Sequence, residues 1–217
     1  MYNFTFNIPT KIHFGKDTIS NLSELKAYGS KVLLVYGGGS IKKNGLYDTS
    51  MKILKDAGLT VFELSGVEPN PKIETVRKGV EICKNEGIDM VLAIGGGSTI
   101  DCSKVVAAGA RYDGDAWDLV LDGSKVKAAL PIFDVLTLSA TGTEMDPFAV
   151  ISDMSKNEKW GTGSPYMVPT MSILNPEYTF SVSKKQTAAG TADMMSHTME
   201  NYFSMENADC QKFMAEG

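Results

Sequence analysis

Four short stretches of the sequence are apolar along almost their whole length, and segments of helical length separate them. The apolar stretches comprise residues 31–36, 60–64, 89–94 and 129–137. The segments between them predict helices over residues 40–57, 73–85 and 98–110. Strands that lack polar alternation are typical of a parallel sheet that is covered by helices on both faces. The pattern therefore predicts an α/β fold with a Rossmann-like parallel sheet and right-handed crossovers.

The remaining segments predict less regular structure. Residues 4–14 alternate apolar and polar side chains around Pro9, which indicates an edge strand or a hairpin. Short strands are expected at residues 148–151 and 170–174, and one long helix from residue 187 to about residue 203.

Composition limits the class of protein. With 43% hydrophobic and 22% charged residues, the chain is not expected to be disordered. The absence of an apolar run of about 18 residues argues against a membrane span, and the first residues lack the pattern of a secretory signal. A net charge of −5 argues against binding to nucleic acids or membrane surfaces. The three widely spaced cysteines, Cys83, Cys102 and Cys210, fit a reducing cytoplasm better than a disulfide framework.

Two of the apolar stretches are followed directly by the same four residues, Gly-Gly-Gly-Ser, at positions 37–40 and 95–98. Such a turn lets backbone N–H groups approach an anion closely, and the N-terminus of the following helix adds unpaired donors. The pyrophosphate of a dinucleotide is the expected ligand. Neither turn has the G-x-G-x-x-G spacing, and a tight turn without a ligand is the alternative. Two matching turns favour binding.

The first turn bears on the type of dinucleotide. A site for NAD usually offers an Asp or Glu to the ribose hydroxyls, whereas here three glycines are followed by hydroxyl and ammonium groups. These donors suit a ribose phosphate and favour NADP(H) over NAD(H). Lys42 and Lys43 could instead be solvated helix charges. The candidate ribose-phosphate residues are Gly37, Gly38, Ser40 and Lys43.

Charged residues elsewhere suggest further chemistry. Asp101 and Lys104 follow the second turn and would lie near a bound phosphate or substrate, although exposed helix charges are the commoner case. Asp193 and His197 stand four residues apart, so on a helix they share one face within reach of a single cation. By spacing alone, such a pair is usually an ordinary polar pair.

Four motifs give the sequence a more specific identity. They read Thr-Leu-Ser-Ala-Thr-Gly-Thr-Glu-Met at 137–145, Gly-Ser-Pro at 163–165, Asn-Pro-Glu-Tyr at 175–178, and Thr-Ala-Ala-Gly-Thr-Ala-Asp-Met-Met-Ser-His-Thr-Met-Glu at 187–200. Together they resemble the iron-containing alcohol dehydrogenase family, above all its NADPH-using, butanol-dehydrogenase-like branch. The likeness runs in order from Tyr2 to about Phe203. Dehydroquinate synthase, a more distant relative of the same architecture, shares the glycine turn but not the Thr-Gly-Thr-Glu motif in this form.

The resemblance implies a dinucleotide-binding domain over residues 1–181 and the beginning of an all-helical, metal-binding domain over residues 182–217. It implies that Asp193 and His197 are the first two ligands of Fe²⁺ or Zn²⁺, and that Asp101 orients the substrate end of the cofactor. The pyrophosphate would bind to Gly95, Gly96, Gly97 and Ser98. The rest of the cofactor groove would be lined by Asn70, Thr137, Leu138, Thr141, Lys159 and Leu174.

The activity implied by the resemblance is hydride transfer between NADP(H) and a primary alcohol or aldehyde such as butanol or butanal. The metal would act as a Lewis acid on the substrate oxygen, and the cofactor would carry the hydride. The expected partners are therefore this small molecule and further copies of the full-length chain in a homodimer or other homo-oligomer, without nucleic acid or membrane.

The sequence departs from the family pattern at three points. Asn175 replaces an expected Asp or Glu, and Ser183 replaces an expected Pro; both should mainly affect local turns. The family also draws two more histidine ligands from downstream helices, whereas no histidine follows His197. Because catalytic metal sites usually have three or more protein ligands, we expect a truncated enzyme. A cofactor-binding module without catalysis is the alternative, and a lyase related to dehydroquinate synthase is disfavoured by the motifs.

Overall fold

The computed structural model describes residues 3, 5, 7–203 and 209–217, without the side chains of residues 210 and 211. The chain divides into two compact units, Met1–Thr179 and Phe180–Gly217, which we describe separately. Cys83 and Cys102 are buried free thiols, whereas the side chain of Cys210 lies outside the described residues.

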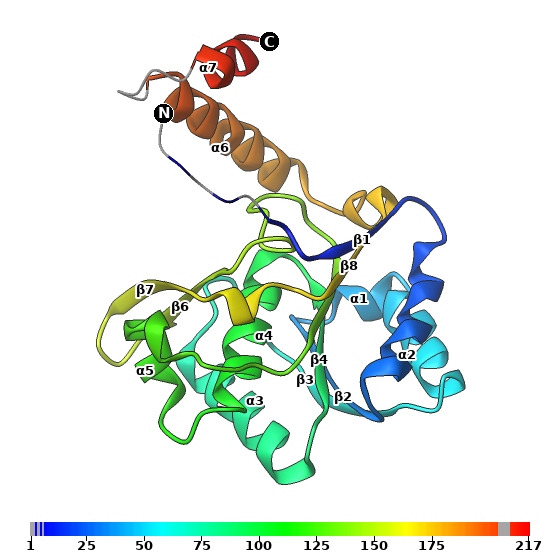
Figure 1. Cartoon of the computed structure of the whole chain (residues 1–217). Helices are drawn as coiled ribbons and strands as arrows, with labels where there is room; N and C mark the ends of the chain where they lie inside the picture. Colours follow the sequence, from blue (N-terminus) through cyan, green and yellow to red (C-terminus); the bar gives the residue numbers. More distant parts are fainter. Residues whose placement is uncertain (1–2, 4, 6, 204–208) are drawn as a thin grey trace. The chain divides into compact units, whose positions relative to one another are not determined.

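A six-stranded parallel sheet with the strand order β1-β8-β5-β4-β2-β3 forms the centre of the first unit (Figure 1). The prediction of a parallel α/β sheet is thus confirmed, and the expected edge strand is β1, paired with β8. The bounds are β1 Lys11–Phe14, β2 Lys31–Tyr36, β3 Thr60–Leu64, β4 Met90–Gly95, β5 Ile132–Leu136 and β8 Met171–Leu174.

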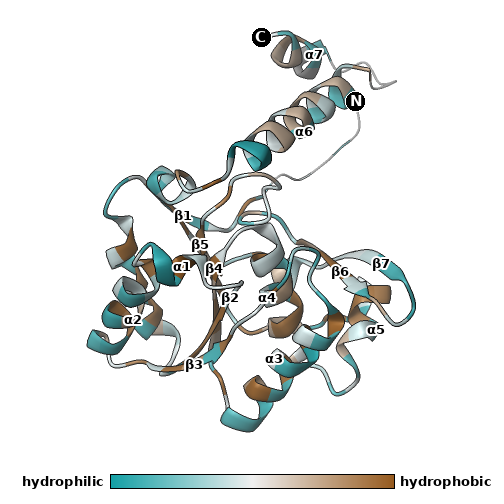
Figure 2. Cartoon of the chain, turned by 180° about the vertical axis from the view of Figure 1, so that it is seen from behind, coloured by the Kyte–Doolittle hydropathy of each residue, from teal (hydrophilic) through white to brown (hydrophobic). Residues whose placement is uncertain are grey.

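Helices cover both faces of the sheet, because each central strand is apolar on both sides. In β2, Leu34 packs toward one face and Leu33 toward the other, and the two residues belong to separate hydrophobic clusters. The central strands accordingly carry apolar residues almost throughout (Figure 2). One layer contains the 3-10 helix η1 (Thr18–Tyr28), α1 (Ser40–Lys43) and α2 (Leu46–Asp56). The other contains α3 (Ile73–Glu86), α4 (Gly97–Gly109) and α5 (Ala116–Leu121).

The single helix expected over residues 40–57 is wrong. Two helices, α1 and α2, occupy this range. Between them Gly45 has a φ of 79°, a left-handed conformation that glycine adopts without steric cost. The Asn44 side-chain oxygen then accepts a hydrogen bond from Leu46 N at 3.2 Å, which starts the second helix.

A β-hairpin adds a second, two-stranded sheet to this unit. Its antiparallel strands are β6 (Phe148–Asp153) and β7 (Glu158–Gly163). The sequence predicts only the first strand, because β7 is mostly polar and contains two glycines. Ser152 N donates to Pro71 O at 2.9 Å, which joins the hairpin to the turn before α3. Short 3-10 helices complete the unit: η2 (Gly123–Lys125), η3 (Pro165–Met167) and η4 (Pro176–Thr179).

The second unit contains α6 (Lys184–Tyr202) and α7 (Asp209–Glu216). The expected long helix is confirmed, but it begins three residues before residue 187 because Ser183 caps it: Ser183 Oγ accepts from Gln186 N at 3.2 Å. No residue of α6 is buried. Among the described helices of the chain, none combines the length and the apolar character that crossing a membrane requires.

Candidate functional site

The two glycine turns lie side by side at the carboxyl edge of the sheet. Tyr36 of β2 is level with Ile94 of β4, so the turns that follow these strands are neighbours. In the sheet, β3 lies on one side of β2 and β4 lies on the other, so the order of the strands changes direction between β2 and β4. In open α/β sheets, ligands bind in the crevice at such a switch in strand order. The predicted turn residues therefore lie where this architecture binds ligands.

The second glycine turn is packed closely against the segment that follows β5. Thr137 N donates to Gly95 O at 2.9 Å. A Cβ atom added to Gly97 would lie 2.9 Å from Thr141 Oγ1, and one added to Gly96 would lie 3.3 Å from the Leu138 Cβ. Helix α4 begins at Gly97, so its first N–H groups have no partner within the helix and suit an anion. The structure thus brings together the predicted residues Gly95, Gly96, Gly97, Ser98, Thr137, Leu138 and Thr141.

Two further predicted groove residues meet at the β6–β7 hairpin. The Lys159 ammonium donates to Asn70 Oδ1 at 2.7 Å, although 89 positions separate the two residues. Asn70 has a φ of 55°, the left-handed conformation that asparagine tolerates better than most residues. The contact holds an exposed cation beside the turn that leads into α3.

The first glycine turn is more open. Gly66 N donates to Gly37 O at 3.2 Å, whereas a Cβ atom added to Gly38 would meet nothing within 4 Å. Ser40 is the first residue of α1. The Lys42 ammonium lies over two aromatic rings, 5.0 Å from the centroid of Tyr36 and 4.4 Å from that of Tyr47. Lys42 and Lys43 are both exposed, but the ring contacts hold the Lys42 ammonium, so Lys43 is the better candidate to meet a ligand at this turn.

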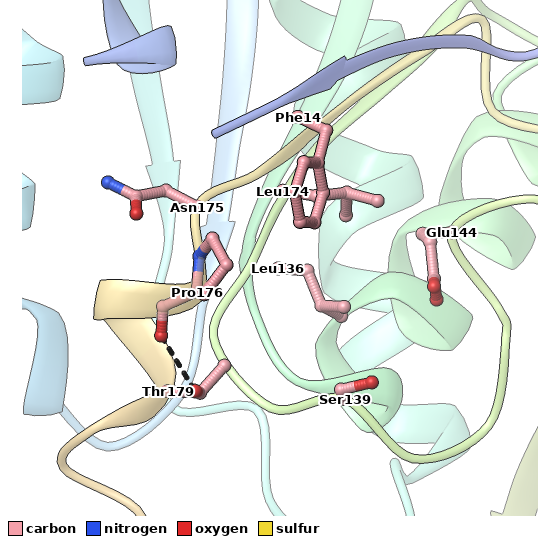
Figure 3. A pocket seen from close by; sticks show the side chains of 8 residues that line it. All are labelled: Phe14, Leu136, Ser139, Glu144, Leu174, Asn175, Pro176 and Thr179. Atoms are coloured by element: carbon pink, nitrogen blue, oxygen red, sulfur yellow. Dashed lines mark hydrogen bonds between the residues drawn. The ribbon is translucent and has the colours of Figure 1, made fainter. Parts of the chain in front are cut away.

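A cavity of about 270 Å³ opens beyond the ends of β5 and β8 (Figure 3). Its lining is mainly apolar and includes Leu174, a predicted groove residue, which packs beside Leu136 of the neighbouring strand. Only 9% of Glu144 is exposed. The lining residues are Phe14, Leu136, Ser139, Glu144, Leu174, Asn175, Pro176 and Thr179.

Asp101 and Lys104 are not exposed helix charges. Asp101 Oδ1 accepts from the Thr143 hydroxyl at 2.7 Å, and Oδ2 accepts from Val150 N at 3.0 Å. Lys104 is completely buried. Burial raises the pKa of Asp101 and lowers that of Lys104. Both oxygens of the predicted catalytic Asp101 are therefore engaged by the protein.

Helix α6 carries the predicted metal ligands. Asp193 Oδ1 lies 3.8 Å from His197 Nε2, and both side chains are more than half exposed. A carboxylate and an imidazole on one helix face suit Fe²⁺ or Zn²⁺. Within residues 3, 5, 7–203 and 209–217, no His, Cys, Asp or Glu completes a group of three. The described residues thus supply two ligands of a metal site and no third.

Comparison with known proteins identifies the family. The model of the family described as "Iron-containing alcohol dehydrogenase" matches residues 9–176, most of the α/β unit. The chain belongs to the iron-containing alcohol dehydrogenase family.

Several relatives of the chain have names that state an activity. It is 60% identical to NADH-dependent butanol dehydrogenase A of Clostridium acetobutylicum, with 100% of this chain and 56% of the relative covered. It is 39% identical to the NADPH-dependent aldehyde reductase YqhD of Escherichia coli, with 100% and 57% covered. The solved structure of NADH-dependent butanol dehydrogenase A from Thermotoga maritima superimposes with a TM-score of 0.94 at 47% identity, covering 100% and 55%. The chain therefore spans about half the length of the curated relatives it matches.

The chain also contains a buried acid that the sequence interpretation missed. Asp134 of β5 is 1% exposed, and its Oδ2 lies 2.6 Å from Ser172 Oγ in β8. Ser172 Oγ also lies 2.8 Å from Glu144 O. A hydroxyl has one proton, so Ser172 donates it to the carbonyl and accepts one from a protonated Asp134. The available signal was an acidic residue inside an otherwise apolar strand.

Proposed function

We propose that this chain binds a nicotinamide dinucleotide across the carboxyl edge of its sheet. The main support is the packing of two glycine turns side by side at the switch in strand order. Gly95, Gly96, Gly97 and Ser98 would bind the pyrophosphate, since α4 begins there with unpaired N–H groups. Thr137, Leu138, Thr141, Leu174 and the contacting pair of Asn70 and Lys159 would line the rest of the groove.

We further propose a preference for NADP(H), with Gly37, Gly38, Ser40 and Lys43 around the ribose phosphate. The turn carries no carboxylate from residue 37 to residue 43. The names of the relatives differ: four that are 54–60% identical to this chain are named for NADH, whereas the Escherichia coli protein, at 39% identity, is named for NADPH. The proposed preference for NADP(H) is therefore supported by the hydrogen-bond donors at the turn alone.

Lys43→Ala tests this preference. Its loss removes a cation from the ribose phosphate, so NADPH affinity should fall about three- to tenfold while NADH affinity stays unchanged. Cofactor fluorescence titration measures both. Lys42→Ala is the matched control, because Lys42 lies over the rings of Tyr36 and Tyr47. Equal NADPH affinity in wild type and Lys43→Ala contradicts a role for this lysine.

The proposed activity of the complete enzyme is metal-dependent transfer of a hydride between NADP(H) and a primary alcohol or aldehyde such as butanol or butanal. Asp193 and His197 would hold Fe²⁺ or Zn²⁺ from residues 182–217, which we propose to be the start of the helical domain after the dinucleotide domain of residues 1–181. Bound there, the ion would supply Lewis-acid polarisation of the substrate oxygen. Asp101 would keep the adjoining end of α4 in place through Thr143 and Val150. The complete protein would form a homodimer or other homo-oligomer.

Metal titration tests the ligand pair. Two ligands should bind Zn²⁺ weakly, and Asp193→Asn should weaken that binding roughly tenfold or more, because a neutral amide replaces the carboxylate. Isothermal titration calorimetry of this chain measures the change. Asp209→Asn on α7 is an acidic control on the other helix of the unit. Equal Zn²⁺ affinity in wild type and Asp193→Asn would contradict the assignment.

A second function is cofactor binding without catalysis. It is favoured by the presence of only two candidate metal ligands among the described residues. Reduction of butanal by NADPH, with Fe²⁺ or Zn²⁺ added, separates the two proposals. Turnover supports an active enzyme, whereas tight NADPH binding without turnover supports the binding module.

A further inference from the structure

One of the largest completely buried side chains in the described part of the α/β unit is charged. Lys104 extends from the middle of α4, and none of its surface is exposed. Its ammonium reaches the segment between β5 and β6, which also contains Thr141. We propose that Lys104 is a positioning residue that holds residues 141–148, here named the threonine loop, against the second glycine turn. The proposal rests on the proposed cofactor binding at that turn.

All the donors of Lys104 are used on the threonine loop. Its Nζ donates to Thr143 Oγ1 at 2.8 Å and to Phe148 O at 2.8 Å. It also donates to the backbone O of Asp146 at 2.8 Å and to Asp146 Oδ1 at 2.9 Å. Three N–H bonds thus serve four oxygens on three residues of the loop. A single side chain therefore fixes both the middle and the end of this segment.

The hydrogen bonds continue from the loop back to α4 in one direction only. An ammonium group cannot accept a hydrogen bond, so Thr143 Oγ1 accepts one from Lys104. The Thr143 hydroxyl then donates its own hydrogen bond to Asp101 Oδ1 at 2.7 Å. Thr143 is thereby bound to two residues of the same helix. Any shift of the loop along α4 would break both contacts.

The clamped loop forms one side of the glycine turn. Thr141 precedes Thr143 by two residues, and its Oγ1 would be 2.9 Å from a Cβ atom on Gly97. Thr141 Oγ1 also accepts from Thr143 N at 3.4 Å. The position of Thr141 beside the first turn of α4 therefore depends on Thr143, and through it on Lys104.

The charge of Lys104 serves geometry more than stability. A buried ion pair contributes little net stability, because the cost of removing both charges from water offsets their attraction. Burial lowers the pKa of Lys104, and the acidic groups that oppose this are Asp146, Asp101 and Asp134. Above the lowered pKa, the neutral amine has two N–H bonds for four oxygens. The loop should then loosen, and cofactor affinity should fall as pH rises.

Lys104→Met replaces the ammonium with an apolar group of similar length. Without cofactor, the rate of hydrogen–deuterium exchange should then rise roughly tenfold or more for the amides of residues 141–150, because losing one buried hydrogen bond changes the opening equilibrium by about this factor. The exchange rate in β2 and β4 should stay unchanged. The dissociation constant for NADPH should rise by a similar factor. It should also lose the alkaline dependence expected for the wild type.

Two further variants complete the experiment. Lys84→Met is the control, because the Lys84 ammonium donates to Tyr112 O at 2.6 Å, away from the loop; it should leave exchange and NADPH binding unchanged. Thr143→Val keeps Lys104 but removes the hydroxyl between Lys104 and Asp101. Thr143→Val should raise exchange at residues 141–150 as well. If Lys104→Met does not fold, the exchange data of Thr143→Val test the proposal in its place.

The outcomes separate this inference from the proposed function. Failure of the wild type to bind NADPH or NADH overturns the proposed cofactor binding. The exchange data would still test whether Lys104 holds the threonine loop, which is the clamp proposed here. Unchanged exchange at residues 141–150 in Lys104→Met, or in Thr143→Val if Lys104→Met does not fold, overturns the clamp. An equal rise across all the strands, which indicates only a loss of stability, also overturns it.

Discussion

Asp134 of β5 and Ser172 of β8 form a buried hydrogen-bonded pair between neighbouring strands. Asp134 must carry a proton to satisfy Ser172, whose own proton is donated to Glu144 O. Burial raises the pKa of Asp134 well above 3.8. Above pH 3.8 the folded chain therefore holds a proton that the unfolded chain releases. By linkage, this residue makes the folded state less stable as pH rises.

Asp134→Asn should remove that cost. The asparagine amide can donate to Ser172 Oγ as the protonated acid does, and it does not ionise. The variant should therefore gain stability relative to the wild type as pH rises from 4, by up to about 1.4 kcal/mol per pH unit. Urea unfolding between pH 4 and 7 measures the difference, with Asp48→Asn on the exposed side of α2 as control. A constant difference across this range would show that Asp134 is ionised in the folded chain.

Single residues also show where sequence interpretation ends. The residue types at the glycine turns were predictable, because backbone approach to an anion needs glycine at a strand end. The burial of Lys104 was not, since nothing in the local sequence shows that a loop 40 positions later places its carbonyl oxygens above α4. Asp134 was missed because its partner comes from β8, 38 positions away.

At the scale of elements, α3 and α4 pack through a reciprocal pair of glycines. A Cβ atom on Gly79 of α3 would lie 2.6 Å from Val106 Cγ2, and one on Gly109 of α4 would lie 2.6 Å from Val80 Cγ2. Each valine thus fills the space that a glycine of the other helix leaves. The two helices approach each other more closely here than any other residue type would permit.

Gly79→Ala should therefore destabilise the chain. Alanine favours the helix by about 0.5–1 kcal/mol, but overpacking against Val106 costs about 1–3 kcal/mol, so a net loss of roughly 1 kcal/mol is expected. Chemical denaturation measures it. Gly190→Ala in α6 is the control, since a Cβ atom there meets nothing within 4 Å, and its unfolding midpoint should not fall. A Gly79→Ala variant as stable as the wild type would mean that the two helices separate at little cost.

The elements themselves were predicted unevenly. The apolar strands of the sheet centre were found because burial on both faces makes them continuous in sequence. The break at Gly45 was missed although the sequence carries a signal for it, because the pair Asn44-Gly45 is typical of a turn. Strand β7 was missed for the opposite reason: hydrogen bonds to β6 hold it, rather than an apolar pattern of its own.

At the scale of the molecule, the first unit should be independent. All the residues proposed to bind cofactor lie within Met1–Thr179, which has large hydrophobic clusters on both faces of its sheet. A chain of residues 1–179 should fold cooperatively and bind NADPH within about twofold of the 217-residue chain. Circular dichroism and fluorescence titration measure both. A shortened chain that does not fold, or that folds and binds NADPH much more weakly, would show that residues 180–217 contribute to the unit.

The pairing of β1 with β8 has a consequence for synthesis of the chain. Lys11 is opposite Met171, so 160 positions separate partners that share a ladder of hydrogen bonds. At roughly 5–20 residues per second, the ribosome needs on the order of ten to thirty seconds to deliver the second strand after the first. Throughout that time the backbone of β1 lacks the strand with which it pairs. The segment that emerges earliest is therefore open to chaperone capture or mispairing until β8 arrives.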